Sequence, residues 1–122
     1  FDLHVSKEII KQEIVSEAKE TSIFVRSDRK MVKVRFKEIN YIESLSDYVK
    51  IFTDKETIIT RETISNIESK LPSNEFLRTH RSYIVSMPKI DSFTNEFLEL
   101  DKKAIPISRS YKENVLQKLA GK

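Results

Sequence analysis

The fold is decided between Ser22 and Thr60, where the chain reads SIFVRSDRKMVKVRFKEINYIESLSDYVKIFTDKETIIT. Apolar and polar residues alternate along this stretch, and β-branched and aromatic side chains are frequent. Both features are typical of half-buried β-strands. The pattern predicts short strands at residues 22–27, 31–36, 39–45, 48–53 and 57–60. Because the turns between them are only a few residues long, neighbouring strands have to run antiparallel.

The second half of the chain continues this pattern around two short helices. Thr63 to Leu71 has the spacing of an amphipathic helix, with Thr63 as its N-cap and Pro72 after its end. A last helix is expected after Ser110, which forms a capping box with Glu113. Further strands are expected at residues 76–79, 83–86, 90–94, 97–100 and 104–107. The sequence therefore predicts a mostly β fold with minor α, in which about ten short, largely antiparallel strands form small packed sheets.

The first 20 residues differ from the rest of the chain. Residues 6–18 place isoleucine and valine near helical spacing, and residues 1–20 hold five acidic and three basic side chains. We interpret residues 1–20 as an interdomain linker helix cut from a longer chain, and residues 21–122 as the domain proper. A dimer contact, or a helix packed on its own domain, would give the same pattern.

The composition excludes several kinds of chemistry. The chain has no cysteine, which removes disulfides, thiolate nucleophiles and thiolate zinc sites. Its single glycine is Gly121, so the glycine-rich loops that cradle nucleotide phosphates cannot form. His4 and His80 are far apart, and no third group is evident that would orient His80 and Ser82 for hydrolysis. We therefore expect no metal, no cofactor and no enzyme, and an acidic side chain clustered with His80 would be the sign to the contrary.

The charge distribution favours a polyanionic partner. The net charge is +3, and because residues 1–20 are net acidic, the rest of the chain carries +5. Many ordinary domains are as basic, so this observation alone decides nothing. No apolar run approaches the roughly 20 residues that a membrane span needs. We expect a cytoplasmic domain without membrane contact in this part of the chain.

Three polar clusters lie at strand or helix boundaries, where side chains can project from a rigid scaffold. They are residues 44–50, 78–82 and 108–110. The last cluster stands at the N-terminus of the final helix, which favours an anion. Arginine suits guanine O6 and N7, and hydroxyl groups suit phosphate oxygens. Each cluster alone could be a solvated turn, but three of them in one small domain indicate an interaction surface.

Two stretches resemble the hallmark sequences of LytTR domains. They are YIESLSDYVKI at residues 41–51 and FLRTHRSYIV at residues 76–85, and the similarity continues through IPISR at residues 105–109. It extends from about Thr21 to Leu119. The resemblance implies a sequence-specific DNA-binding domain, the output domain of a bacterial two-component response regulator in transcription regulation. It also implies that loops in the major groove, not a recognition helix, read the bases.

Carried over by position, the resemblance implies base contacts by Asp47 or Tyr48, by Arg81 and by Arg109. Phosphate contacts are expected from Lys50, His80, Ser82, Ser108, Ser110 and Lys112. The implied partners are double-stranded DNA with promoter direct repeats, an upstream receiver domain and a second copy of the chain on DNA. The alternative interpretation is a β-rich protein-interaction module, which predicts no salt-sensitive DNA binding.

Overall fold

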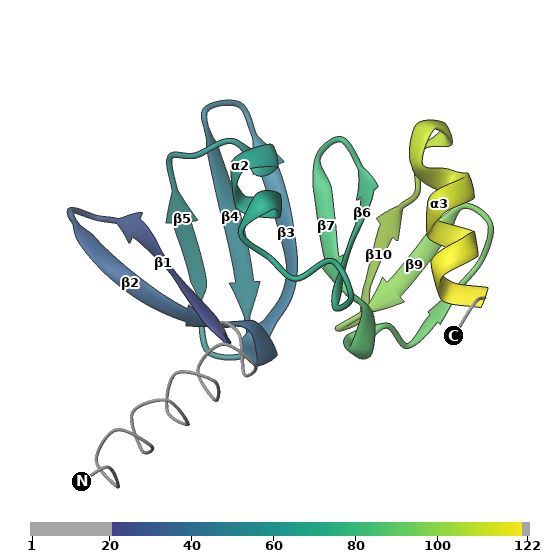
Figure 1. Ribbon diagram of the computed structural model, residues 1–122, viewed down its shortest axis with the longest axis horizontal. Coiled ribbons are helices and arrows are strands. Elements are labelled where there is room, and N and C mark those ends of the chain that lie inside the picture. The colour runs from purple at the N-terminus through teal and green to yellow at the C-terminus, as the bar shows by residue number, and fades with distance from the viewer. Residues whose placement is uncertain (1–20, 121–122) are drawn as a thin grey trace, which may run out of the picture.

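A computed structural model describes residues 21–120 of the chain (Figure 1). These residues form ten strands: β1 (Ser22–Ser27), β2 (Lys30–Arg35), β3 (Ile39–Leu45), β4 (Tyr48–Thr53), β5 (Thr57–Thr60), β6 (Phe76–His80), β7 (Tyr83–Ser86), β8 (Ser92–Phe93), β9 (Phe97–Leu100) and β10 (Lys103–Pro106). They also form the helices α2 (Ile64–Ser69) and α3 (Arg109–Ala120), and the short 3-10 helices η1 (Phe36–Glu38) and η2 (Met87–Lys89). The helix predicted at residues 6–18 lies outside the described residues.

The ten strands form three antiparallel sheets. The central sheet has five strands in the order β5-β4-β3-β7-β6. The hairpin β1-β2 flanks it on the β5 side, and the sheet β10-β9-β8 lies beyond β6 together with α3 (Figure 1). The prediction of a mostly β fold with small, largely antiparallel sheets is thus confirmed.

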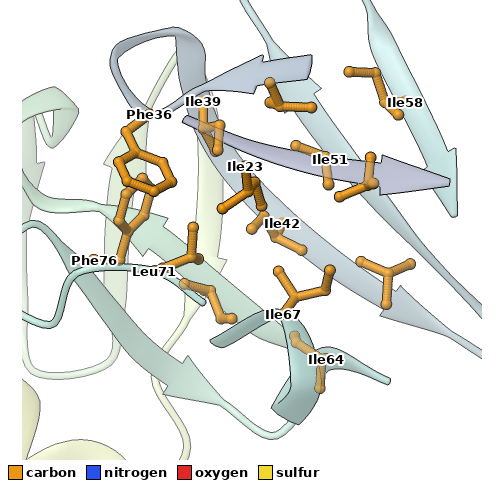
Figure 2. Close-up of a cluster of buried hydrophobic side chains, with 14 residues drawn as sticks. Ile23, Phe36, Ile39, Ile42, Ile51, Ile58, Ile64, Ile67, Leu71 and Phe76 are labelled. Carbon is orange, nitrogen blue, oxygen red and sulfur yellow. The ribbon is translucent and has the colours of Figure 1, made fainter. Parts of the chain in front are cut away.

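The central sheet has a separate hydrophobic core on each face. In its middle strand, Ile42 pairs with Ile51 of β4 and with Ile84 of β7, so these three side chains share one face. On that face they meet Ile23 of β1 and Ile67 of α2 (Figure 2). Each fully buried isoleucine contributes roughly 1.5–3 kcal/mol of hydrophobic stabilisation. The first core therefore joins β1, β2 and α2 to the sheet.

The second core lies on the opposite face. Tyr41 and Val85 pair across β3 and β7 and face Leu98 and Ile105 of the third sheet. Val115 of α3 is fully buried in the same cluster. The second core therefore fixes the third sheet and α3 against β6 and β7.

Two hairpins turn through residues with positive φ, and neither contains glycine. Asp28 and Arg29 have φ of 53° and 69° between β1 and β2, and Asp101 and Lys102 have φ of 52° and 61° between β9 and β10. Two consecutive positive φ values define the type I′ turn, whose twist matches that of a hairpin. A Cβ atom in this conformation costs roughly 1–2 kcal/mol, and aspartate tolerates it better than a long side chain does.

The structure differs from the predicted elements in places. The strand expected at residues 90–94 shortens to β8, because the Ile90 N–H closes η2 by donating to the Met87 carbonyl (3.2 Å). The capping box at Ser110 is wrong, because α3 begins at Arg109 and the Tyr111 N–H already bonds to the Ser108 carbonyl (3.1 Å). The Thr63 cap is confirmed, since its hydroxyl accepts from the Asn66 N–H (3.1 Å).

Candidate nucleic-acid interface

The three polar clusters predicted from the sequence meet at one end of the molecule. The β3–β4 turn, the β6–β7 turn and the start of α3 all lie along the upper edge in Figure 1. The Ser44 N–H donates to the Ser82 carbonyl (2.8 Å), and the Ser108 N–H donates to the Thr79 carbonyl (2.9 Å). These backbone bonds fix the three segments as one surface. We call it the loop edge, and it consists of residues 44–48, 79–82 and 108–112.

The first segment of the loop edge is the tip of the β3–β4 hairpin. Leu45 pairs with Tyr48, so Asp47 is exposed in the turn and Tyr48 is half-buried at the start of β4. Lys50 pairs with Glu43, two residues further along the strand. At about 3.3 Å per residue, its backbone lies roughly 7 Å behind that of Tyr48. Asp47 and Tyr48 are thus at the tip, whereas Lys50 lies behind it.

The second segment, the β6–β7 turn, is held by Arg78, whose side chain is only 10% exposed. Its Nε donates to the His80 carbonyl (2.8 Å) and its Nη2 to the Arg81 carbonyl (2.7 Å). Its Nη1 pairs with Glu68 of α2 (2.6 Å), and the guanidinium lies 5.5 Å from the centre of the Tyr111 ring in α3. Every nitrogen of this guanidinium is engaged inside the protein. Arg78 therefore ties α2, the turn and α3 together.

Side chains in the β6–β7 turn are also oriented by one another. The Ser82 N–H donates to His80 Nδ1 (3.1 Å), which leaves the proton of a neutral imidazole on Nε2. The His80 ring packs edge-on against Tyr83, with ring centres 5.7 Å apart. Arg81 is exposed at the turn itself. An oriented imidazole N–H and an exposed guanidinium are both donors suited to nucleic acid.

Tyr83 links this turn to the central sheet. Its hydroxyl donates to Glu43 Oε2 (3.1 Å). Burial raises the pKa of Tyr83, and the negative charge of Glu43 and its hydrogen bond raise it further. The phenol therefore stays protonated and keeps donating at neutral pH.

The third segment is the N-terminus of α3. Arg109 and Ser110 are exposed, and Ser108 and Lys112 are half-buried. The first N–H groups of an α-helix lack partners within the helix, and the helix dipole makes this end attractive to anions. Val115, buried in the second core, anchors the helix that presents them.

Within residues 21–120, no group of three acidic or histidine side chains is arranged to hold a metal ion. The imidazole of His80 bonds to the Ser82 backbone and packs on Tyr83, so among these residues it has no hydrogen-bonded carboxylate. In the same range, neither helix has the length and hydropathy that a bilayer crossing requires.

Comparison with known proteins agrees with this geometry. The family model of the LytTr DNA-binding domain matches residues 29–120. The chain belongs to this family. The match includes all three segments of the loop edge, so the protein is a LytTR domain that binds DNA.

Curated relatives of this LytTR domain are longer bacterial regulators. The chain is 29% identical over 113 residues to the sensory transduction protein LytT of Bacillus subtilis, an alignment that covers 88% of the chain and 47% of that protein. It is 31% identical over 91 residues to the transcriptional regulatory protein NatR of Bacillus subtilis, covering 68% of the chain and 39% of NatR. The chain thus spans about half the length of the curated relatives it matches.

A solved structure confirms the fold of the LytTR domain. The LytTr DNA-binding domain of a Bacillus cereus protein, described as a methyl-accepting/DNA response regulator, superposes with a TM-score of 0.69. The two chains are 24% identical, and the match covers 85% of this chain and 100% of that one.

Arg78 of this LytTR domain has a role that was not predicted from the sequence. The polar cluster at residues 78–82 includes it together with the exposed Arg81, although Arg78 is largely buried and holds the turn from within. The available signal was the position of Arg78 in a predicted strand, directly after the apolar residues Phe76 and Leu77. In the structure, Arg78 pairs with Ile84 of β7. A charged residue in such a position needs a partner, and Glu68 supplies one.

Proposed function

We propose that this LytTR domain is the DNA-reading output domain of a bacterial response regulator that controls transcription. The observation that carries the proposal is the loop edge, in which segments from distant parts of the chain are joined by the Ser44–Ser82 and Thr79–Ser108 backbone bonds. Three rigidly connected polar loops can enter a groove together, which isolated solvated turns would not do. The names of LytT and NatR, a sensory transduction protein and a transcriptional regulatory protein, support the same role.

Residues at the tips of the three segments read the bases in the major groove. Arg81 and Arg109 are exposed, and their forked donors match guanine O6 and N7. The Asp47 carboxylate can accept a hydrogen bond from cytosine N4, and the Tyr48 ring offers an apolar surface to a thymine methyl group.

A second group of side chains holds the DNA backbone. It consists of Lys50, His80, Ser82, Ser108, Ser110 and Lys112. Contacts to phosphate carry no sequence information, but they fix the register in which the tip residues meet the bases. The oriented Nε2–H of His80 and the N-terminus of α3 supply donors of this kind.

The rest of the protein supplies the signal. Because the curated relatives are about twice as long as this chain, we assign an upstream receiver domain to the full-length protein. Residues 1–20 then serve as the interdomain linker. The protein acts in the cytoplasm. Two copies of it bind the direct repeats of a promoter, with one domain on each repeat.

Selection of bound sequences from a random DNA pool tests this function. We expect one short enriched motif, repeated in the same orientation at a spacing near a helical turn of about 10 base pairs. Selection with Arg81→Ala should lose information at one position of the motif, while selection with Arg35→Ala, an exposed arginine away from the loop edge, should return the same motif. If no motif is enriched and DNA binding does not respond to salt, the protein-interaction module is the better interpretation.

A further inference from the structure

A group of arginines lies next to the loop edge without belonging to it. Arg61 directly follows Thr60, which pairs with Val49 at the start of β4. Arg61 therefore leaves the sheet beside Tyr48 and the β3–β4 turn. A surface hollow joins Arg61 to Arg26 and to Arg29 of the β1–β2 turn. In Figure 1 the end of β5 lies at the top beside the β3–β4 hairpin, and the β1–β2 turn lies to the left of it and lower.

The charge of this hollow is unbalanced. Arg26, Arg29 and Arg61 are all exposed, and Asp28 is the single acidic residue among those that line it. Among residues 21–120, no carboxylate forms an ion pair with any of the three guanidinium groups. Unpaired guanidinium groups clustered on a rigid hairpin and strand end are well suited to phosphate oxygens.

We propose that Arg26, Arg29 and Arg61 form an additional phosphate-binding site, which holds the DNA backbone outside the bases that the loop edge reads. The inference rests on the proposed DNA-reading function and extends its footprint. The β6–β7 turn, the β3–β4 turn and the end of β5 form a row along one end of the central sheet, in the strand order from β6 to β5. At about 4.8 Å per strand, this row is roughly 19 Å long, and the β1–β2 turn extends it further. Such a row spans several successive phosphates of a duplex strand.

Three exposed apolar residues lie near the hollow, and they raise the question of a protein partner. Phe24 and Met31 are 55% and 59% exposed, and Ile59 is 47% exposed. Only Ile59 lines the hollow, whereas Phe24 and Met31 do not. The arginines thus dominate the hollow, and its continuity with the DNA-reading surface favours DNA as the occupant.

The test is a pair of triple variants with equal loss of charge. The first is Arg26→Gln, Arg29→Gln, Arg61→Gln, and the second is Lys37→Gln, Lys55→Gln, Lys102→Gln. The three lysines are exposed at the opposite ends of the strands, Lys37 in η1, Lys55 in the β4–β5 turn and Lys102 in the β9–β10 turn. Binding of the 122-residue chain is measured against salt on a duplex that extends well beyond the selected motif, and on one trimmed to its borders.

On the long duplex, we expect the arginine variant to bind roughly 10- to 100-fold more weakly than the lysine variant near 0.1 M salt, with a salt slope flatter by about 2–3. The arginine variant should lose the same affinity when the sequence that flanks the motif is scrambled. Its loss should be smaller on the trimmed duplex, which lacks the flanking phosphates. Replacement of the same three arginines by lysine should keep most of the binding. This result would show that the glutamine variant binds weakly because it has lost charge and not because it has misfolded.

The outcomes separate this inference from the proposed function. If the wild-type chain fails to discriminate the selected motif from scrambled DNA, the proposed function fails. If the wild-type chain discriminates but both triple variants bind the long duplex alike, the arginine site is wrong, and the hollow faces a protein partner instead.

Discussion

Arg78 Nη1 lies 2.6 Å from Glu68 Oε1, and this ion pair joins β6 to α2 directly behind the β6–β7 turn. The Arg78 side chain is 10% exposed and that of Glu68 is 46% exposed, so water screens the pair from one side only. The same guanidinium holds the carbonyl groups of His80 and Arg81. One largely buried side chain therefore holds β6, α2 and the β6–β7 turn together, and we expect both stability and DNA binding to depend on it.

Arg78→Lys should weaken both properties. A lysine ammonium is a compact charge and cannot reproduce the planar fork that reaches three acceptors on two sides. We expect a loss of about 1–3 kcal/mol in the free energy of unfolding, and weaker binding because the carbonyl groups of the turn lose their anchor. Urea unfolding and DNA titration measure the two effects, with Arg35→Lys as the exposed control. An Arg78→Lys protein indistinguishable from the control would contradict the positioning role.

Arg81→Ala and Arg109→Ala should each weaken binding to the selected motif by about 1–3 kcal/mol while the fold survives. Both side chains are exposed, so truncation leaves the two cores intact. The loss of binding free energy should be much smaller on scrambled DNA, so the difference in affinity between the selected motif and scrambled DNA should decrease.

Lys112→Ala provides the contrast, because a phosphate contact acts equally on any sequence. The wild-type plot of log affinity against log salt should have a slope of roughly −3 to −5, and Lys112→Ala should flatten it by about 1. If Lys112→Ala abolished discrimination at an unchanged slope, the division into base-reading and backbone-holding residues would be wrong.

Strands and loops of this protein differ in how far sequence predicts them. Alternation in β3 and β4 predicts which residues share a face, because a period of two is imposed by the pleat itself. Proximity of the three loops has no such local signal. It depends on the pairing of Tyr41 with Val85 and on the packing of Val115 into the second core, contacts between residues far apart in the chain.

Candidate site residues show the same limit. The contacts of Asp47, Arg81 and Arg109 with DNA stay a prediction. Their exposure was predictable, since polar residues at turns and helix ends stand out from an alternating pattern. The inward role of Arg78 was not, because Glu68 and Tyr111 reach it from two different helices. The ends of short elements were also missed, as at Ile90, where a 3-10 hydrogen bond wins over strand pairing.

Tyr83→Phe should change the response to alkaline pH. Burial and the nearby Glu43 raise the pKa of Tyr83 in the folded protein, while the unfolded chain ionises near pH 10. The contribution of Tyr83 to the free energy of unfolding is complete below pH 10. It is lost as the pH rises through the pKa of Tyr83 in the folded protein, because the phenol loses its proton at lower pH in the unfolded chain.

Urea unfolding between about pH 8 and pH 11 measures this. The wild-type protein should lose stability with rising pH more steeply than Tyr83→Phe, which should start about 1 kcal/mol lower at neutral pH through loss of the bond to Glu43. Some decline should remain in the variant, because burial also raises the pKa of Tyr41. Parallel curves for the two proteins would rule out this coupling.

Deletion of residues 1–20 should leave folding intact. Among residues 21–120, the buried members of both core clusters lie between Ile23 and Val115, and Thr21 is held by the bond from the Phe36 N–H to its carbonyl (2.9 Å). Denaturant unfolding of the truncated chain should be cooperative, with a midpoint close to that of the full chain, and affinity for one motif copy should be unchanged. Loss of cooperative unfolding would show that this segment belongs to the domain and is not a linker.

Lys102→Gly should stabilise the protein, which is unusual for a substitution by glycine. Lys102 has φ of 61° at the second position of the β9–β10 turn, where glycine has no Cβ penalty. We expect a gain of about 0.5–1 kcal/mol after the greater freedom of glycine in the unfolded chain is subtracted. Lys102→Ala is the matched control, since it removes the same charge but keeps the Cβ atom, and it should give no gain.

Arg29→Gly makes the same test at the other strained turn, where φ is 69°. It should raise the urea midpoint as Lys102→Gly does, because the physical cause is the same. Its effect on DNA should differ, since Arg29 belongs to the proposed backbone site and Lys102 lies at the opposite end of the strands. Arg29→Gly should therefore be more stable yet bind the long duplex more weakly, whereas Lys102→Gly should gain stability at unchanged affinity. The matched control here is Arg29→Ala. If neither glycine variant is more stable than its alanine control, the positive φ at these turns has no measurable energetic cost, because the surrounding strands impose it.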